Sequence, residues 1–552
     1  MTMRASPLIA SSAALCLALL SATTQTAYAR REYALGDATF EAHLRVTSST
    51  RNASAPFGLG GDASHTKPSL KDICDDSVEQ EAGYYVVDGT RDLNMFYWYV
   101  CLGVERRSTH ARTHARTRAR FTQPALPYPP SHLLTHIMTR HSLLFPLLSF
   151  SCRFFESRGD PAKDPIILWM TGGPGCSDAT ALFEENGPCR LPSGASRPER
   201  NEYSWNTRAS VIYIDQPCGV GYSYGAASDE DKNEAGVAKH VGNFLLEFFD
   251  NHPELQSLEL FITGESYGGH YVPAVADAVR GSLPLRGVAI GNGLTVPEIQ
   301  FEYYPEMAYK YAKKVLGEPV ISYPTYLAQR AGWPTCQRLI QRCQNDTDAC
   351  GSAQRVCQAL MFAPYTLSGK NPYNIELACE KQPLCYDFTN LDEYMNAPQV
   401  KEALGVPPEV EWQDCNQTVN AMFYKDWMRN FDAQIVDLLS HQVDVVIYAG
   451  DLDFICNWLG NKAWTLAMDW EGKEAFNNAE DEQRIHHDGT PIGEVRTTKP
   501  EGSGRFSFFR IFDAGHLAPM DQPKVTLHMI EVLTGERAPN AQRAEAAVRI
   551  TK

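Results

Sequence analysis

The sequence predicts an α/β fold with a central, mostly parallel sheet and one largely helical insertion. Ile166–Met170 and Ser210–Ile214 are nearly continuous apolar runs, which is typical of strands buried on both faces of a sheet. Helical spacing follows at residues 235–249, and strands that alternate with helices indicate parallel pairing. A cysteine-rich stretch at residues 295–432 breaks this alternation. It predicts a disulfide-stapled helical cap inserted into the sheet domain.

The composition is that of a globular, acidic protein. The chain has 552 residues, of which 43% are hydrophobic and 11% aromatic, so a large core is available. Its formal net charge is −16 and its pI is about 5.4, which argues against a nucleic-acid partner. The sequence has no metal-ligand spacing and no phosphate-binding loop. We therefore expect no cofactor.

The first 72 residues predict a targeting segment and a lead-in. Arg4, the apolar residues 8–20 and the small residues 27–29 are typical of a secretory signal peptide covering residues 1–29. The apolar run is too short for a membrane span, so we expect none in the mature chain. Residues 30–72 are polar and rich in Gly and Ser, which indicates a propeptide or a disordered lead-in.

A secretory route also fits the cysteine content. The chain has 15 cysteines, one of them in the predicted signal, and disulfides form in oxidising compartments. Behind a signal peptide, Asn-x-Ser/Thr sequons become plausible glycosylation sites. They begin at Asn52, Asn345 and Asn416.

Residues 73–294 are predicted to form the first part of the core. Two β-rich runs, at residues 82–87 and 93–100, flank Asp88 and Gly89, which is a hairpin signal. We expect residues 101–153 to be an unstructured insertion. Its near-repeat of T-H-A-R at residues 109–120 allows three interpretations: a contact with an anionic surface, a solvated loop, or translated non-coding sequence. We favour the last, which sequencing of the transcript would test.

The α/β pattern continues to the end of the first part of the core. It returns after the cap, in residues 433–536, which are predicted to form the second part of the core. Apolar runs predict strands at residues 287–290, 443–448 and 505–511. A final helix is expected from about residue 523 to residue 533. Residues 537–552 are expected to form a tail.

The most informative motif is G-x-S-x-G at residues 264–268. The near-alternating Leu258, Leu260 and Ile262 predict a strand before it. Residues 271–280 predict a helix after it, with Pro273 in the first turn, where a missing N–H costs nothing. A serine on such a strand-to-helix turn is a nucleophile elbow, in which glycines relieve crowding around an exposed hydroxyl.

Three candidate catalytic residues follow predicted strands in the order Ser266, Asp453, His516. This is the chain order of an α/β-hydrolase triad, and the carboxyl ends of parallel strands meet at one edge of a sheet. His516 would accept the proton of Ser266, and Asp453 would orient the imidazole. Asp451 is the main rival of Asp453, because spacing alone does not separate them.

In combination, these motifs resemble those of the serine carboxypeptidase family, within it the carboxypeptidase Y-like branch. The resemblance covers roughly residues 70 to 535 apart from the insertion. It implies an α/β-hydrolase fold and the release of C-terminal residues from peptides or proteins at acidic pH, by acyl-enzyme catalysis. The matching segments are residues 169–177, 264–269, 450–458 and 514–516, with 215–217 and 371–373 in support.

The resemblance also implies roles for individual residues. It makes Ser266 the nucleophile, Asp453 the orienting acid and His516 the base, with an oxyanion hole from the backbone N–H groups of Gly173 and Tyr267. Two neighbouring carboxyl groups that share a proton would hold the substrate carboxylate, which explains an acidic optimum. The implied substrate-binding residues are Thr171, Gly172, Glu185, Glu265, Tyr373, Cys456 and Leu517.

Disulfide pairings follow from the same resemblance. It implies bonds Cys176–Cys415, Cys336–Cys357, Cys343–Cys350 and Cys379–Cys385. Cys74, Cys189 and Cys218 stay unassigned. The family also suggests a vacuole or lysosome, or the cell exterior, whereas the sequence itself indicates only the secretory pathway. The oligomeric state stays open.

Two departures from the family pattern leave alternatives open. Thr171 stands where the peptidases of the family carry an Asn. A Thr at this position resembles the plant acyltransferase branch, which uses sugar esters. Glu265, however, is the residue of the peptidases, which we favour. Glu184 occupies a position that is usually apolar in carboxypeptidase Y, so the preferred terminal residue is open. A third possibility is a partner-stabilising protein, like the structural role of lysosomal cathepsin A.

Overall fold

The computed structural model describes residues 70, 73–78, 80–87, 93–99, 156–382, 384–486 and 489–535. All of them belong to one structural unit. The expected signal peptide, nearly all of the lead-in, Asn52, the hairpin turn at Asp88, the segment 101–153 and the tail lie outside these residues. In the described part of the chain, no helix combines the length and the apolar character that a bilayer crossing requires.

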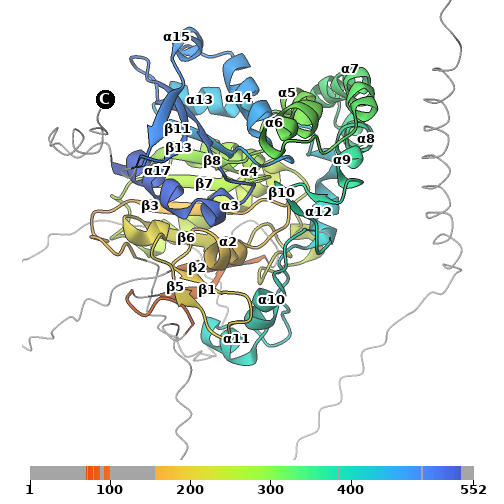
Figure 1. Ribbon diagram of the computed structural model, residues 1–552. Helices are drawn as coiled ribbons and strands as arrows, with labels where there is room; N and C mark the ends of the chain where they lie inside the picture. The colour runs from red at the N-terminus through yellow and green to blue at the C-terminus, as the bar shows by residue number, and fades with distance from the viewer. Residues whose placement is uncertain are drawn as a thin grey trace, which may run out of the picture. The chain divides into compact units, whose positions relative to one another are not determined.

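A ten-stranded sheet organises the fold (Figure 1). Its strands from β6 through β3, β7, β8 and β11 to β14 are parallel, and the pairs β1–β2, β2–β6, β14–β13 and β13–β12 are antiparallel. The mostly parallel sheet is thus confirmed, whereas the edge strand β12 and its neighbour β13 were not predicted. In sheet order the strands are β1 (Glu81–Val86), β2 (Asn94–Tyr99), β6 (Ser210–Ile214), β3 (Ile166–Met170), β7 (Leu260–Glu265), β8 (Leu285–Gly291), β11 (Asp444–Gly450), β14 (Phe506–Ile511), β13 (Pro491–Thr498) and β12 (Glu482–Ile485).

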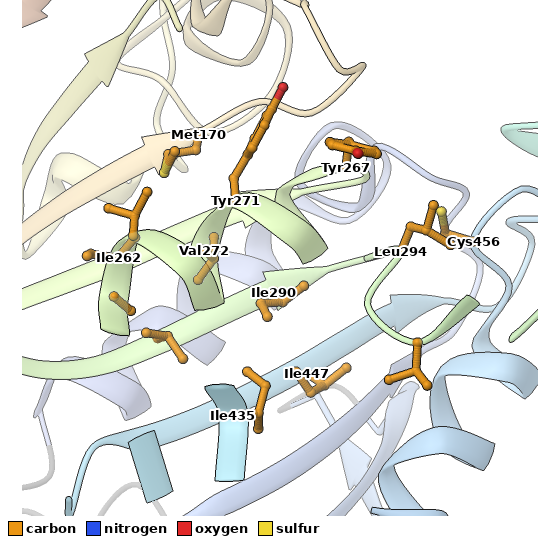
Figure 2. Packing of buried hydrophobic residues seen from close by; sticks show 14 of the residues in the cluster. Met170, Ile262, Tyr267, Tyr271, Val272, Ile290, Leu294, Ile435, Ile447 and Cys456 are labelled. Carbon is orange, nitrogen blue, oxygen red and sulfur yellow. The ribbon is translucent and has the colours of Figure 1, made fainter. Parts of the chain in front are cut away.

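Helices cover both faces of the sheet. Successive side chains of a strand point to opposite faces, and both sets are apolar in the central strands, so each face is buried beneath helices. Leu168 and Ile262 point to the face covered by α3 (Glu234–Asn251), α4 (Gly268–Val279) and α13 (Asp432–Ser440). Figure 2 shows this face, with Tyr271 and Val272 of α4 together with Ile262 and Ile290 of the strands. Residues of the opposite parity, such as Ile167 and Trp169, pack against α2 (Asp178–Glu184) and α17 (Pro523–Gly535). The central strands are therefore buried on both sides, as their apolar runs predict.

The helix after the elbow begins earlier than its sequence suggests. α4 starts at Gly268, directly after the turn, so Pro273 lies inside the helix and not in its first turn. The prediction of a start at residue 271 was wrong because it relied on the local preference of proline. Tertiary packing decides instead: a Cβ on Gly269 would lie 2.5 Å from the Leu294 carbonyl oxygen, so glycine lets the helix start against this loop.

The stretch after β8 is largely helical, as expected. In Figure 1 the green helices α5 to α9 lie together at one side of the sheet, next to α14. The elements here are α5 (Pro297–Gln300), α6 (Ala312–Leu316), α7 (Tyr323–Asn345), α8 (Thr347–Cys357), α9 (Ala363–Thr366), β9 (Lys370–Asn371), β10 (Asn374–Ala378), α10 (Thr389–Met395), α11 (Pro398–Leu404) and α12 (Gln417–Met422).

Shorter elements complete the fold. Two π-helical segments, Glu306–Tyr311 and Gln358–Phe362, adjoin α6 and α9. The others are β4 (Cys189–Arg190), β5 (Glu199–Arg200), α14 (Trp458–Ala467), α15 (Lys473–Asn478), α16 (Ala518–Asp521) and 3₁₀ turns at Trp205–Thr207, Ala227–Asp229, Phe301–Tyr303 and Phe423–Lys425.

Disulfides fasten the insertion internally and to the core. Cys336–Cys357 and Cys343–Cys350 join α7 to α8, and Cys379–Cys385 closes a short loop. Cys176–Cys415 ties the insertion to the loop after β3. These are the four pairs that the resemblance implied. A fifth bond, Cys74–Cys189, joins two of the unassigned cysteines, and Cys218 is a buried free thiol.

Candidate active site

Ser266 occupies the sharp turn between β7 and α4. Its φ of 62° lies in the left-handed region that non-glycine residues rarely adopt, which is the strain expected of a nucleophile elbow. The loop after β3 presses against this turn. A Cβ on Gly172 would come within 2.3 Å of the Tyr267 backbone nitrogen and 2.9 Å of the Ser266 Cβ. Glycine at 172 therefore allows the closest approach of the two loops.

Asp453 and His516 form the second half of the predicted triad. His516 Nδ1 lies 2.9 Å from Asp453 Oδ2, and both side chains are buried. Asp453 Oδ2 also accepts hydrogen bonds from the Asn292 amide, at 2.8 Å, and from the Cys456 backbone, at 3.2 Å. Because Asp453 engages Nδ1, the other ring nitrogen, Nε2, is left for proton transfer. Ser266 and His516 line the same cavity.

Asp451, the rival of Asp453, has a structural role. Its Oδ2 accepts from the Tyr311 hydroxyl and from Arg510 Nη2, both at 2.9 Å, and its Oδ1 accepts from the Asp513 backbone at 3.0 Å. The Arg510 guanidinium also stacks 4.0 Å above the Trp458 ring. These contacts hold the β11 and β14 loops together. The geometry thus assigns the contact with His516 to Asp453.

Two backbone N–H groups are available near the nucleophile. Among the described residues, neither Gly173 nor Tyr267 donates its N–H to another backbone group. Tyr267 directly follows Ser266, and Gly173 adjoins the loop that meets the elbow and lines the cavity. Free donors at the N-terminus of a helix are what a developing oxyanion requires.

The cavity beside Ser266 has a volume of about 430 Å³. Seven of the predicted substrate or oxyanion residues line it: Thr171, Gly172, Gly173, Glu185, Glu265, Tyr373 and Leu517. Cys456 is buried and does not line it, whereas its neighbour Ile455 does. Glu184 also lies outside the lining. The structure thus brings most of the predicted residues to one cavity, whereas Tyr267, Cys456 and Glu184 are not part of its lining.

Glu185 and Glu265 form a buried carboxyl pair at the wall of the cavity. Each residue has about 1% of its surface exposed, so both carboxyl groups are shielded from solvent. Burial raises the pKa of both carboxyl groups, and for Glu265 the neighbouring Glu185 carboxyl raises it further. Two such groups are best accommodated when they share a proton. The pair therefore offers both a donor and an acceptor to a ligand carboxylate in acid.

Thr171 is anchored by its surroundings. Its hydroxyl accepts from Trp169 Nε1 at 2.9 Å, and its backbone N–H donates to Asp178 Oδ1 at 2.6 Å. Asp178 in turn accepts from the Ile214 backbone at 2.8 Å. These bonds fix the loop after β3 at the end of the two neighbouring strands, β3 and β6.

Sequence reasoning missed three polar residues of this site. Asn292 holds Asp453, and its Oδ1 also accepts from the Gly450 backbone at 3.1 Å. It directly follows β8, and a polar residue after a central strand is a signal that could have found it. Thr180 and Asp414 line the cavity and hydrogen-bond to each other. Nothing local in the sequence marks that pair.

One group of potential metal ligands occurs among the described residues. One donor atom from each of Asp453, Cys456 and His516 lies within 4.8 Å of the others. Asp453 Oδ2 already takes part in three hydrogen-bond contacts, and burial raises the pKa of the Cys456 thiol, which disfavours the thiolate that metals bind. The arrangement fits a triad with an adjacent thiol better than a metal centre.

The two described sequons differ in their surroundings. Asn345 is exposed at the end of α7. Asn416 caps α12 through its Oδ1, and its Nδ2 donates to the Gly219 carbonyl at 2.8 Å. Glycosylation at either residue stays a prediction.

Comparisons with known proteins agree on one family. Residues 152–536 match the family model described as serine carboxypeptidase. Carboxypeptidase Y of Candida albicans is 42% identical over 388 residues, which cover 68% of this chain and 69% of the relative. A serine carboxypeptidase-like protein of Oryza sativa subsp. japonica is 39% identical over 400 residues, or 70% of this chain and 90% of the relative. A solved structure of a prohormone-processing carboxypeptidase from Saccharomyces cerevisiae shares the fold, with a TM-score of 0.64 at 20% identity, over 84% of this chain and 93% of that chain.

Proposed function

The chain belongs to the serine carboxypeptidase family, and we propose that it releases C-terminal residues from peptides at acidic pH through an acyl-enzyme on Ser266. Membership makes it a hydrolase of the exopeptidase class. One observation carries the assignment of roles: Ser266 and His516 line the same cavity as the buried carboxyl pair Glu185 and Glu265. A nucleophile beside a carboxylate-binding pair is what cleavage at a free C-terminus requires.

The proposed reaction uses the triad twice. Ser266 Oγ attacks the carbonyl carbon of the last peptide bond while His516 accepts its proton, and Asp453 stabilises the resulting imidazolium. The oxyanion is bound by the N–H groups of Gly173 and Tyr267. When the C–N bond breaks, His516 donates the proton to the departing amine, which leaves an ester on Ser266. A water molecule, deprotonated by His516, then attacks this ester and frees the shortened peptide.

We infer that the carboxyl pair makes the enzyme an exopeptidase. A substrate carboxylate can accept a hydrogen bond from the protonated member of the pair, and the Gly172 backbone and the Thr171 side chain border the same space. The raised pKa values of Glu185 and Glu265 support retention of that proton in acid. Loss of the proton near neutrality would place anionic groups against an anionic ligand. Tyr373 and Leu517 are proposed to contact the substrate side chains beside the scissile bond. Cys456 does not line the cavity, and its proposed effect on the substrate is therefore indirect.

The proposed organisation keeps the boundaries derived above. It comprises a signal peptide at 1–29, a lead-in at 30–72, core segments at 73–294 and 433–536, a cap at 295–432 and a tail at 537–552. We propose a secretory destination, either a vacuole or lysosome or the cell exterior. The signal-like N-terminus and the five disulfides support it.

The test is product analysis with a blocked dipeptide at pH 5, followed by mass spectrometry. We expect release of the free C-terminal amino acid, and none from Ser266→Ala. Labelling by a fluorophosphonate probe, lost in the same variant, checks that Ser266 is activated. A parallel incubation with a glucose ester and an alcohol addresses the acyltransferase, which Thr171 favours. Turnover of the ester alone would contradict the peptidase, and no labelling at all would favour a partner-stabilising protein.

A further inference from the structure

The cavity contains one acidic group that the proposed mechanism does not use. Apart from the tyrosines Tyr373 and Tyr386, its titratable lining comprises the pair Glu185 and Glu265, the base His516, Lys370 and Asp414. Lys370 donates its Nζ to the Glu376 carbonyl at 3.2 Å. Asp414 is therefore the carboxyl group of the lining that has no place in the mechanism.

Asp414 is held in position on one side and open on the other. Its Oδ1 accepts from the Thr180 hydroxyl, and its backbone carbonyl accepts from the Ser177 N–H at 2.8 Å. The adjacent Cys415 is fixed by its bond to Cys176. No ion pair to Asp414 and no further partner of its side chain occurs among the described residues. A carboxyl oxygen of a rigidly placed side chain is thus available to a ligand in the cavity.

The position of Asp414 relative to the carboxyl pair sets the length of that ligand. Thr180 lies in α2 and Glu185 is its C-cap, and the four helical steps from Thr180 to Glu184 correspond to about 6 Å along the helix axis. A C-terminal residue whose carboxylate meets Glu185 would need a long side chain to reach the oxygen beside Thr180. Tyr373, Leu384 and Leu517 provide apolar surface in the same cavity. An aliphatic stem with a polar head fits this sequence of surfaces.

We propose that Asp414 is a specificity-determining residue and that the enzyme prefers peptides that end in arginine or lysine. The inference rests on the proposed function, because it needs the terminal carboxylate at Glu185 and Glu265. In it, the stem of the terminal residue lies along the apolar lining, and the guanidinium or ammonium donates to Asp414. Glu184, whose position also departs from the family pattern, lies outside the lining, and burial raises the pKa of its carboxyl group to about 7.

The preference depends on pH in a defined direction. Burial raises the pKa of Asp414 to about 6, the Thr180 hydrogen bond opposes this, and the charge of Asp392 adds to it. Glu184 also faces Asp414, with Arg190 beside Glu184, and Lys381 lies near Asp392. Asp414 is neutral well below pH 6 and anionic above it, and a bound cation favours the anion. The preference for a basic residue therefore grows between pH 4.5 and 6.5.

The experiment compares matched substrates on one enzyme preparation. Four N-blocked dipeptides differ only in the last residue: arginine, its neutral isostere citrulline, lysine and norleucine. Because the ratio of two kcat/KM values cancels the common effect of the Glu185 and Glu265 pair, it isolates the contact with the head group. We expect a ratio of roughly tenfold or more for arginine over citrulline at pH 6.5, since a hydrogen bond to a charged group is involved. The ratio is smaller at pH 4.5.

Two variants complete the test. Asp414→Asn keeps an oxygen for Thr180 and is expected to bring the arginine-to-citrulline ratio close to one. Glu184→Gln, the matched control outside the lining, is expected to keep the ratio within about twofold of the unmodified enzyme. A ratio near one in the unmodified enzyme, or an unchanged ratio in Asp414→Asn, overturns the proposal.

The outcomes separate this inference from the function on which it rests. Release from all four substrates at equal rates refutes the role of Asp414 and leaves the carboxypeptidase intact. Release from none refutes both. If Asp414→Asn fails to fold, as judged by fluorophosphonate labelling, the pH series with the unmodified enzyme decides, and a ratio that does not rise from pH 4.5 to 6.5 contradicts the proposal.

Discussion

The Asn292 amide donates a 2.8 Å hydrogen bond to Asp453 Oδ2, although the two residues are 161 positions apart in the chain. The bond arises because β8 and β11 are neighbours, so the loops that follow them meet at the same rim. Asn292 has a φ of 41°, which directs its side chain from a backbone conformation that few residues adopt. It thus supports Asp453, the residue proposed to orient the catalytic base.

Removal of the Asn292 side chain is expected to lower activity without unfolding the protein. Asn292→Gly tolerates the positive φ and deletes the hydrogen bond to the buried Asp453 carboxylate, a loss of about 1.5–3 kcal/mol, together with the acceptor of the Gly450 N–H. This corresponds to a decrease of roughly 10- to 150-fold in kcat/KM. Steady-state kinetics with a blocked dipeptide measures it, and fluorophosphonate labelling rates provide an independent readout. Unchanged values in both assays would contradict a positioning role.

The neighbouring aspartates Asp451 and Asp453 should respond oppositely to the same substitution. Asp453→Asn is expected to lower kcat by about four orders of magnitude with little change in stability, since the amide favours the wrong imidazole tautomer. Asp451→Asn removes one of the two ionic partners of the half-buried Arg510, the other being Glu494, and should cost about 1.5–3 kcal/mol of unfolding free energy through weakened charged hydrogen bonds. Kinetics and urea denaturation of both variants measure this. A similar loss of kcat in the two would refute the assignment.

The KM for peptides should rise from pH 5 towards neutrality. Burial raises the pKa values of Glu185 and Glu265, so the pair keeps a proton in acid and loses it as pH rises, which then repels the substrate carboxylate. A C-terminally amidated version of the same substrate has no carboxylate and serves as the control. Glu185→Gln should flatten the pH dependence. A pH-independent KM for the free acid would contradict the prediction.

The same pair should make folding less favourable at higher pH. The pKa values of the two carboxyl groups in the folded protein lie above the unfolded value of about 4.3. At a pH between the unfolded and the folded pKa values, the unfolded chain binds fewer protons than the folded protein, so the free energy of unfolding falls as pH rises. Each group contributes up to about 1.4 kcal/mol per pH unit in this window. Urea midpoints at pH 5 and pH 8 measure the slope, and Glu265→Gln should reduce it. A slope of the opposite sign for this pair would be inconsistent with its burial.

The disulfides should contribute according to the loops that they close. Cys176–Cys415 spans 239 positions and Cys343–Cys350 spans 7. Chain entropy then gives about 5.5 kcal/mol for the first and about 2.5 kcal/mol for the second. Paired Cys-to-Ser variants, unfolded in urea without reductant, measure the difference. Since Cys176 and Cys415 also line the cavity, only that pair should alter KM. Equal losses of stability would count against the loop-length account.

Local patterns were sufficient for the parts of the fold that are buried on both sides. Ile166–Met170 and Ser210–Ile214 form strands with the predicted bounds because every residue in them is buried. The edge strand Glu482–Ile485 was missed since its residues are exposed or half-buried and carry no apolar period. The start of α4 was misplaced because packing against Leu294 outweighed the local preference of Pro273.

The site was predictable as far as its chemistry is tied to motifs. Ser266 and His516 can be identified from the sequence, because each has a neighbouring glycine and follows a predicted strand. The choice between Asp451 and Asp453 needed the fold, because only the paths of β11 and β14 bring Arg510 to one and His516 to the other. Asp414 is hydrogen-bonded in the cavity to Thr180, which lies 234 positions away in the chain. A local sequence pattern cannot predict a contact between residues so far apart.

The bond between Cys74 and Cys189 bears on how the polypeptide withstands proteases. These residues are 115 positions apart, and the whole of segment 101–153 lies between them. A backbone cut anywhere in that interval divides the chain in two but leaves the pieces covalently joined. The nicked molecule would therefore migrate as a single band on a gel until thiols are added.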